Sequence, residues 1–169
     1  MQSRPPKLFV GVGNVLKRDD GVGVRVAQIM AGLRLPPSVE VYDAGTVGLE
    51  AAAMLERRQL VVVADAIEAA AEPGAIFRFS PQQLRPYVKT ALSLHDVHLL
   101  DALDETRLLG TAPAQVTVFA VQVGDVSTGL GLSPAVEASL EKVLRLAAEA
   151  LGLPASILER GSAAASALV

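Results

Sequence analysis

The sequence predicts an α/β protein: a three-layer α/β/α fold around a twisted, mostly parallel central sheet of about five strands. Short apolar runs rich in β-branched residues alternate with longer segments whose apolar residues recur at helical spacing. This alternation is typical of a parallel sheet covered by helices on both faces. The clearest run, at residues 60–66, begins LVVVA, so both faces of that strand must be covered.

Five strands are expected, at residues 8–12, 39–42, 60–66, 75–80 and 116–123. The fourth reads AIFRFS, and its partial alternation predicts an antiparallel or edge strand. Four helices are expected, at residues 21–33, 49–55, 94–109 and 134–151, the last with a proline at its start. Residues 1–153 are therefore expected to form a single domain. Residues 154–169 lose the apolar periodicity, and we expect a partly disordered tail there.

Composition excludes several classes of function. The 169 residues are 51% hydrophobic and 20% charged, as in a globular domain. The net charge of −3 gives no electrostatic basis for binding nucleic acid or an anionic membrane, and the apolar runs are too short to span a bilayer. The chain has no cysteine, which excludes disulfides, thiolate zinc sites and a cysteine nucleophile. A cytoplasmic location is expected.

A glycine-rich loop follows the first expected strand. The stretch GVGNVLKRDDGVG, beginning at Gly11, combines four glycines with two adjacent acids. A dinucleotide-binding loop needs a third glycine where Leu16 stands, and the lysine and hydroxyl of a phosphate loop are also missing, so no nucleotide is expected. Asp19 or Asp20 could cap the following helix. One cap accounts for only one of the two acids.

Other acids stand in comparable positions. Asp43 and Asp65 come at the ends of the second and third expected strands. Ligands of open α/β sheets bind outside the carboxyl ends of the parallel strands, so these acids and the Asp19/Asp20 pair should meet at one edge. Each acid alone could equally cap a helix or form a turn. Their convergence favours a site.

Both histidines lie in LSLHDVHLLDAL. Ser93 and Asp96 have capping-box spacing, which predicts a helix start at Ser93. His95 then lies in the first turn, where the helix dipole favours the neutral imidazole that binds metals, and His98 could share its face. Acids at strand ends with such a histidine suggest an oxygen and nitrogen site suited to nickel, zinc or iron.

These motifs together resemble those of the nickel–iron hydrogenase maturation proteases. The resemblance rests on GVGNVLKRDDGVG, DAGTVG, VVVADAIEA followed by PG, SLH, and LSPAV before the final helix. It runs in order from about Leu8 to Leu151. It implies a phosphorylase/hydrolase-like version of the α/β fold and an aspartyl-type endopeptidase of the cytoplasm.

In that family the enzyme removes a C-terminal extension from the hydrogenase large-subunit precursor after nickel insertion. By motif, the resemblance implies Asp20, Asp65 and His95 as metal-contacting residues, with Asp20 and Asp65 as the catalytic carboxylates. Nickel is expected to be carried by the precursor, which is the expected partner. Nucleic acid and membrane are not expected as partners.

The segment DAGTVG corresponds to the substrate-recognition loop of the family, which implies this role for Asp43, Gly45 and Thr46. Two features depart from the family pattern. Ala44 replaces a common glycine, and VQVGD lacks a proline after Gln122. Both leave the identity of the substrate open.

Three questions stay open from the sequence. The Asp/Asp/His set could serve a nickel-binding chaperone or sensor that does not cut. In a protease, the attacking group could be a carboxylate or a metal-activated water. Thr46 could also be only a helix cap.

Overall fold

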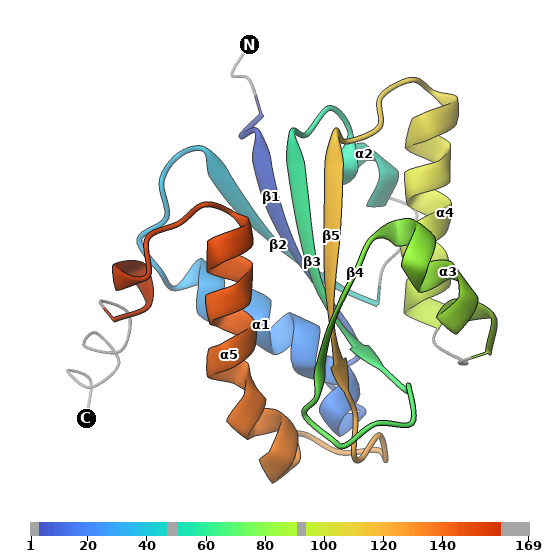
Figure 1. Cartoon of the computed structure of the whole chain (residues 1–169), viewed down its shortest axis with the longest axis vertical. Coiled ribbons are helices and arrows are strands. Elements are labelled where there is room, and N and C mark those ends of the chain that lie inside the picture. Colours follow the sequence, from blue (N-terminus) through green and yellow to red (C-terminus); the bar gives the residue numbers. More distant parts are fainter. Residues whose placement is uncertain (1–3, 47–50, 91–93, 160–169) are drawn as a thin grey trace.

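The computed structural model describes residues 4–46, 51–90 and 94–159, without the side chains of residues 88–90 and 94–97. Its centre is a five-stranded sheet in the order β2-β1-β3-β5-β4 (Figure 1). The strands are β1 Lys7–Val12, β2 Val39–Gly45, β3 Leu60–Ile67, β4 Ile76–Phe79 and β5 Gln115–Gln122. β1, β2, β3 and β5 are parallel, and β4 pairs antiparallel with β5 at one edge. The predicted α/β sheet and its antiparallel edge strand are confirmed.

Helices cover both faces of the sheet, which completes the predicted three layers (Figure 1). On one face lie α1 Val22–Ala31 and α5 Pro134–Ala150. On the other lie α2 Ala51–Leu55, α3 Pro81–Thr90 and α4 Leu94–Leu108. A short 3-10 turn, η1 Arg18–Gly21, precedes α1.

Helix α3 was not expected from the sequence, yet its start carries a recognisable signal. The Ser80 hydroxyl accepts a hydrogen bond from the Gln83 N–H at 3.3 Å, and the Gln83 side chain accepts one from the Ser80 N–H at 2.8 Å. This is a capping box with Pro81 in the first helical position. The polar composition and Pro86 inside the helix hide the apolar periodicity that would otherwise have indicated it.

The central strand β3 divides the core into two clusters, because alternate side chains point to opposite faces. Val62 and Ala64 pack with α1 and α5. Val61 and Val63 pack with α2, α3 and α4. By this alternation, Asp65 belongs to the face that α4 covers.

Close packing explains much of the glycine content of the first loop. A Cβ atom on Gly23 would lie 2.1 Å from the Ala64 carbonyl oxygen and 2.2 Å from that of Val12, and one on Gly11 would lie 2.2 Å from the Gly23 oxygen. Helix α1 therefore begins in direct backbone contact with β1 and β3. These glycines fix where α1 starts relative to the carboxyl ends of the strands.

The chain after α5 is more firmly attached than the sequence predicts. Ile157 is buried, and Leu158 packs against the core cluster of α1 and α5. Residues 154–159 are therefore packed on the core, and the expected loose tail does not begin at residue 154. Residues 160–169, which the same prediction covers, lie outside the described residues.

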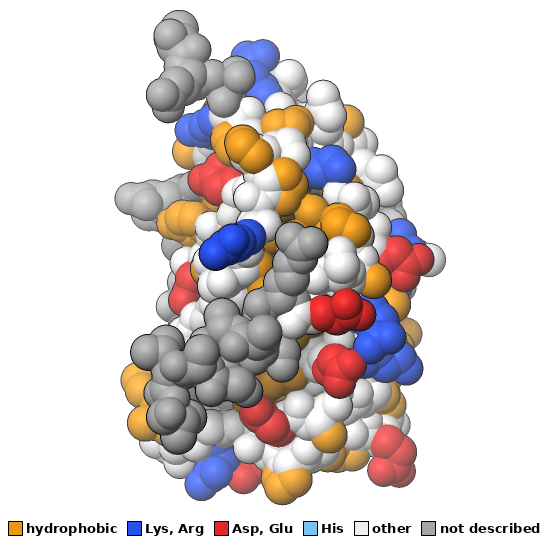
Figure 2. All heavy atoms as spheres, turned by 90° about the vertical axis from the view of Figure 1, so that its left-hand side faces the viewer, with side chains coloured by type: hydrophobic (Ala, Val, Ile, Leu, Met, Phe, Trp, Pro, Cys, Tyr) orange, Lys and Arg blue, Asp and Glu red, His pale blue; other side chains and the backbone are white. Residues whose placement is uncertain are grey.

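Acidic and basic side chains are mixed over the side of the molecule that carries β2 and the end of α5 (Figure 2). This mixing agrees with the small net charge of the chain. None of the helices within the described ranges is long and apolar enough to cross a membrane.

Candidate active site

The register of the sheet brings two of the predicted acids to the same end. Gly11 of β1 lies opposite Asp43 on β2 and opposite Ala64 on β3. Asp65 is the next residue of β3. Asp43 and Asp65 therefore flank the carboxyl end of β1, where the loop that carries Asp20 begins.

Hydrogen bonds attach the Asp20 loop to this end of the sheet. The Gly13 N–H donates to the Gly45 carbonyl oxygen at 2.8 Å. The Asn14 N–H donates to both the backbone oxygen and the Oδ2 of Asp20, each at 3.2 Å. Asp20 is half-buried in η1, which contacts β3. The loop is thus bonded to the end of β2 and lies against the strand that ends near Asp65.

Asp65 is buried, with 1% of its surface exposed, and its Oδ1 accepts the Ala66 N–H at 2.7 Å. His95 occupies the first turn of α4, as the sequence predicts, but its side chain and Ser93 lie outside the described residues. His98 is exposed. Among the side chains that the structure describes, no group of three or more histidines, aspartates or glutamates is arranged to hold a metal. The side chain of His95 is not among them, so the set of Asp20, Asp65 and His95 stays a prediction.

The predicted recognition segment forms a tight turn at the end of β2. The exposed Asp43 accepts the Gly45 N–H through Oδ1 at 3.0 Å. Gly45 has a φ of 50°, which glycine adopts without strain. Ala44 packs against the core cluster of α2, α3 and α4, where a glycine would leave space. Thr46 is exposed, and because residues 47–50 are outside the description, its role as a cap stays untested.

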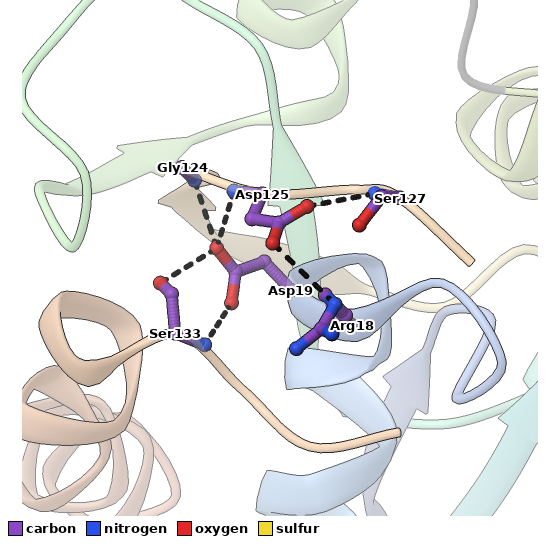
Figure 3. Close-up of polar contacts among 6 residues, drawn as sticks. All are labelled: Arg18, Asp19, Gly124, Asp125, Ser127 and Ser133. Atoms are coloured by element: carbon purple, nitrogen blue, oxygen red, sulfur yellow. Dashed lines mark hydrogen bonds and ion pairs between the residues drawn. The ribbon is translucent and has the colours of Figure 1, made fainter. Parts of the chain in front are cut away.

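The structure corrects the expected role of Asp19 (Figure 3). Neither acid of the pair caps α1, whose N-cap residue is Gly21 with no side-chain hydrogen bond. The Asp19 carboxylate is fully buried and points toward the loop after β5 and the start of α5. Its Oδ2 accepts the N–H groups of Gly124 and Asp125, each at 2.9 Å, and the Ser133 hydroxyl at 2.8 Å; its Oδ1 accepts the Ser133 N–H at 2.6 Å.

These contacts set the charge of Asp19. Burial alone raises the pKa of its carboxyl group, because it disfavours the charged form. The hydrogen bonds from Ser133, Asp125 and Gly124 outweigh burial and hold the pKa below its usual range. Asp19 is therefore a charged anchor with donors around both oxygens.

Further contacts join the same two loops. The Arg18 guanidinium lies 3.4 Å from Asp125 Oδ2, and the Ser127 N–H donates to Asp125 Oδ1 at 2.9 Å (Figure 3). Along the backbone, the Arg18 N–H donates to the Gly129 oxygen at 3.1 Å and the Gly129 N–H to the Leu16 oxygen at 2.9 Å. The loop of residues 13–21 and the loop after β5 thus form one unit. Sequence reasoning missed this because the partners are more than one hundred residues apart; VQVGD and LSPAV stood out only as motifs.

Solved structures share this architecture. The hydrogenase maturating endopeptidase HybD of Escherichia coli matches with a TM-score of 0.81 and 31% identity, over 86% of this chain and 91% of that one. The hydrogenase 2 maturation peptidase of a Thaumarchaeota archaeon matches with a TM-score of 0.68 and 31% identity, over 88% and 99%. The fold and these likenesses define the class of the protein, an α/β peptidase.

Sequence comparisons narrow the class to a family. The family model for hydrogenase maturation proteases matches residues 24–150. The hydrogenase 2 maturation protease of Escherichia coli is 32% identical over 146 residues, which are 85% of this chain and 89% of the relative. The chain belongs to the hydrogenase maturation protease family, as the sequence motifs predicted.

Proposed function

We propose that this protein is the cytoplasmic endopeptidase that removes the C-terminal extension of a nickel–iron hydrogenase large-subunit precursor after nickel has been inserted. The observation that carries the proposal is the placement of Asp20 and Asp65. The loop of Asp20 is bonded to the end of β2 and packed on β3, next to the strand end that carries Asp65. Family membership supplies the reaction class.

Nickel belongs to the substrate in this proposal. Carboxylate oxygens and an imidazole nitrogen are ligands that nickel accepts. Asp20, Asp65 and His95 would complete the coordination of nickel already held by the precursor, so that only a loaded precursor is seated for cleavage. Asp43, Gly45 and Thr46, at the neighbouring strand end, would contact the precursor beside its nickel.

Peptide hydrolysis at this site needs a base near the scissile bond. Water oxygen adds to the carbonyl carbon, the C–N bond breaks, and a proton passes to the leaving nitrogen. An aspartate within hydrogen-bond reach can accept the proton of that water, which is the role that we assign to the Asp20 and Asp65 pair in an aspartyl-type endopeptidase.

Incubation with purified precursor tests the function. A nickel-loaded precursor should be shortened at its C-terminus, as measured by mass spectrometry, and a nickel-free precursor should remain intact. Stoichiometric binding without shortening would instead support a nickel chaperone or sensor. Equal cutting of both precursors would reject the requirement for nickel.

Substitutions test the site. Asp20→Ala, Asp65→Ala and His95→Ala should each lower the cleavage rate by more than the roughly 10- to 100-fold that loss of an outer-shell partner costs. Combining two of them should add little, because the site is already broken. His98→Ala is the matched control on the same helix and should cut like the parent. If His98→Ala abolishes cleavage while His95→Ala retains it, the assignment of the histidine is wrong.

A further inference from the structure

We infer that Asp19 is a positioning residue for this reaction: its buried carboxylate anchors η1 to the chain after β5 and thereby fixes the direction of Asp20. The inference rests on the proposed function, because it assigns a role to Asp19 through its neighbour. Asp19 itself is fully buried and faces protein donors, so it does not contact the substrate.

The four residues of η1 make few stabilising contacts within the turn itself. η1 is a single turn of four residues, and its N-cap residue, Lys17, makes no side-chain cap hydrogen bond. One isolated helical turn is unstable, because its ordering entropy exceeds the gain from so few hydrogen bonds. The orientation of Asp20 must therefore come from contacts outside the turn.

Asp19 supplies the strongest of these contacts. Three backbone N–H groups and one hydroxyl donate to its two oxygens at 2.6 to 2.9 Å. Hydrogen bonds to a charged acceptor are stronger than neutral ones. Successive residues of a 3-10 turn point about 120° apart, so a fixed Asp19 side chain also fixes the direction in which Asp20 leaves the turn.

The same end of β5 also holds the chain beyond Asp65. The buried Gln122 side chain accepts the N–H groups of Ala69 and Ala71 through Oε1 at 2.8 and 3.3 Å, and donates to Glu68 through Nε2 at 2.9 Å. Residues 122–125 are therefore a shared anchor for the segments that follow β1 and β3. The position of Asp20 relative to Asp65 depends on this anchor.

Asp19→Asn is the direct test, because it keeps the shape but places an amide donor against one of the N–H or O–H donors. Single-turnover cleavage of nickel-loaded precursor should slow about 10- to 100-fold, while the Kd for the precursor changes less than about threefold. Ser133→Ala removes only the hydroxyl donor and should slow cleavage by a smaller factor. It carries the test if Asp19→Asn does not fold.

Arg58→Gln is the matched control. Arg58 is also buried, donates to the Met54 and Pro5 carbonyl oxygens and pairs with Glu40, but it lies at the other end of the sheet. Its loss should lower stability and leave the cleavage rate within about threefold. If the folded Asp19→Asn and Ser133→Ala proteins cut as fast as Arg58→Gln, the inference is overturned.

Amide hydrogen exchange at Asn14 separates this inference from the proposed function. The Asn14 N–H donates to Asp20, so it should exchange at least tenfold faster in Asp19→Asn and Ser133→Ala, but not in Arg58→Gln. This readout needs no precursor. Unchanged exchange would overturn the positioning role even if the parent cuts, and faster exchange would support it even if no precursor is cut.

Discussion

At each end of the sheet, one buried charged side chain joins several segments of the chain, and we expect the two residues to have different roles. At the amino end, Arg58 joins the segment before β1, helix α2 and strand β2 through Pro5, Met54 and Glu40. At the carboxyl end, Asp19 joins the loop after β1, the loop after β5 and the start of α5.

The difference lies in what stands beside each residue. Arg58 lies two residues before β3 and has no predicted site residue next to it. Asp19 is followed immediately by Asp20. A buried charge that holds segments together at the amino end therefore contributes to stability, whereas on our inference the buried charge at the carboxyl end also sets the geometry of the proposed site.

The largest expected effect comes from tight packing at the carboxyl end. Gly23→Ala places a Cβ atom about 2 Å from two carbonyl oxygens, so α1 must move away from the sheet. We expect a loss of at least about 3 kcal/mol of unfolding free energy, the upper part of the range for overpacking. Gly32→Ala, at the C-cap of the same helix, meets only an ordinary contact at 3.4 Å and should be neutral or slightly stabilising. Urea denaturation of both variants measures the contrast, and similar losses would contradict it.

The pH dependence of stability should differ between Asp19 and Arg58. The depressed pKa of Asp19 means that its contribution is complete above the usual aspartate pKa of about 3.9 and disappears as pH falls through the lower folded value. Asp19→Asn should cost about 1–3 kcal/mol at pH 7, and the gap to the parent should narrow below about pH 4. Denaturation curves between pH 7 and pH 2 measure this. A gap that stays constant down to pH 2 would contradict the charged anchor.

Truncation tests the amino end again, because the chain after α5 packs there. Removing residues 154–169 deletes the buried Ile157 and should cost about 1.5–3 kcal/mol without changing the cleavage rate. Removing only residues 160–169, which follow the last core contacts at Ile157 and Leu158, should leave both quantities unchanged. Slower cleavage by either truncated protein, measured when it is fully folded, would contradict the claim that the amino end contributes only to stability.

The smallest expected effect compares two acids on β2. Asp43→Asn, at the carboxyl end, should raise KM for the precursor about fivefold, which corresponds to about 1 kcal/mol of lost binding. Glu40→Gln removes the partner of Arg58 and should lower stability but leave KM unchanged. Steady-state kinetics with both variants decides the point. Equal KM values would remove Asp43 from the recognition surface.

The strands, and the position of Asp43 and Asp65 at one end of the sheet, could be predicted from the sequence. Buried parallel strands are nearly continuous apolar runs, and their carboxyl ends lie at one edge whatever the details of packing. Asp43 and Asp65 could thus be placed together from residue order alone. The family motifs then named Asp20 rather than Asp19.

The role of Asp19 could not be predicted in this way. From the neighbouring residues alone, an aspartate before a helix is expected to be its N-cap. Nothing near Asp19 in the sequence points to Gly124, Asp125 or Ser133. Its partners become neighbours only when β5 and α5 are in place. By contrast, α3 was missed although its capping box was present locally, because Pro86 and a polar composition obscured the pattern.

The distance along the chain between Asp19 and its partners has a consequence for synthesis. The donors to its carboxylate are 105, 106 and 114 residues further on. At ribosomal rates of about 5–20 residues per second, they emerge roughly 5–20 s after Asp19. Until then the loop of Asp20 is held at the end of β2 by the bond between Gly13 and Gly45 but lacks the hydrogen bonds of the Asp19 carboxylate. On the role that we infer for Asp19, the proposed site acquires its final geometry only after residues 124–133 have been made.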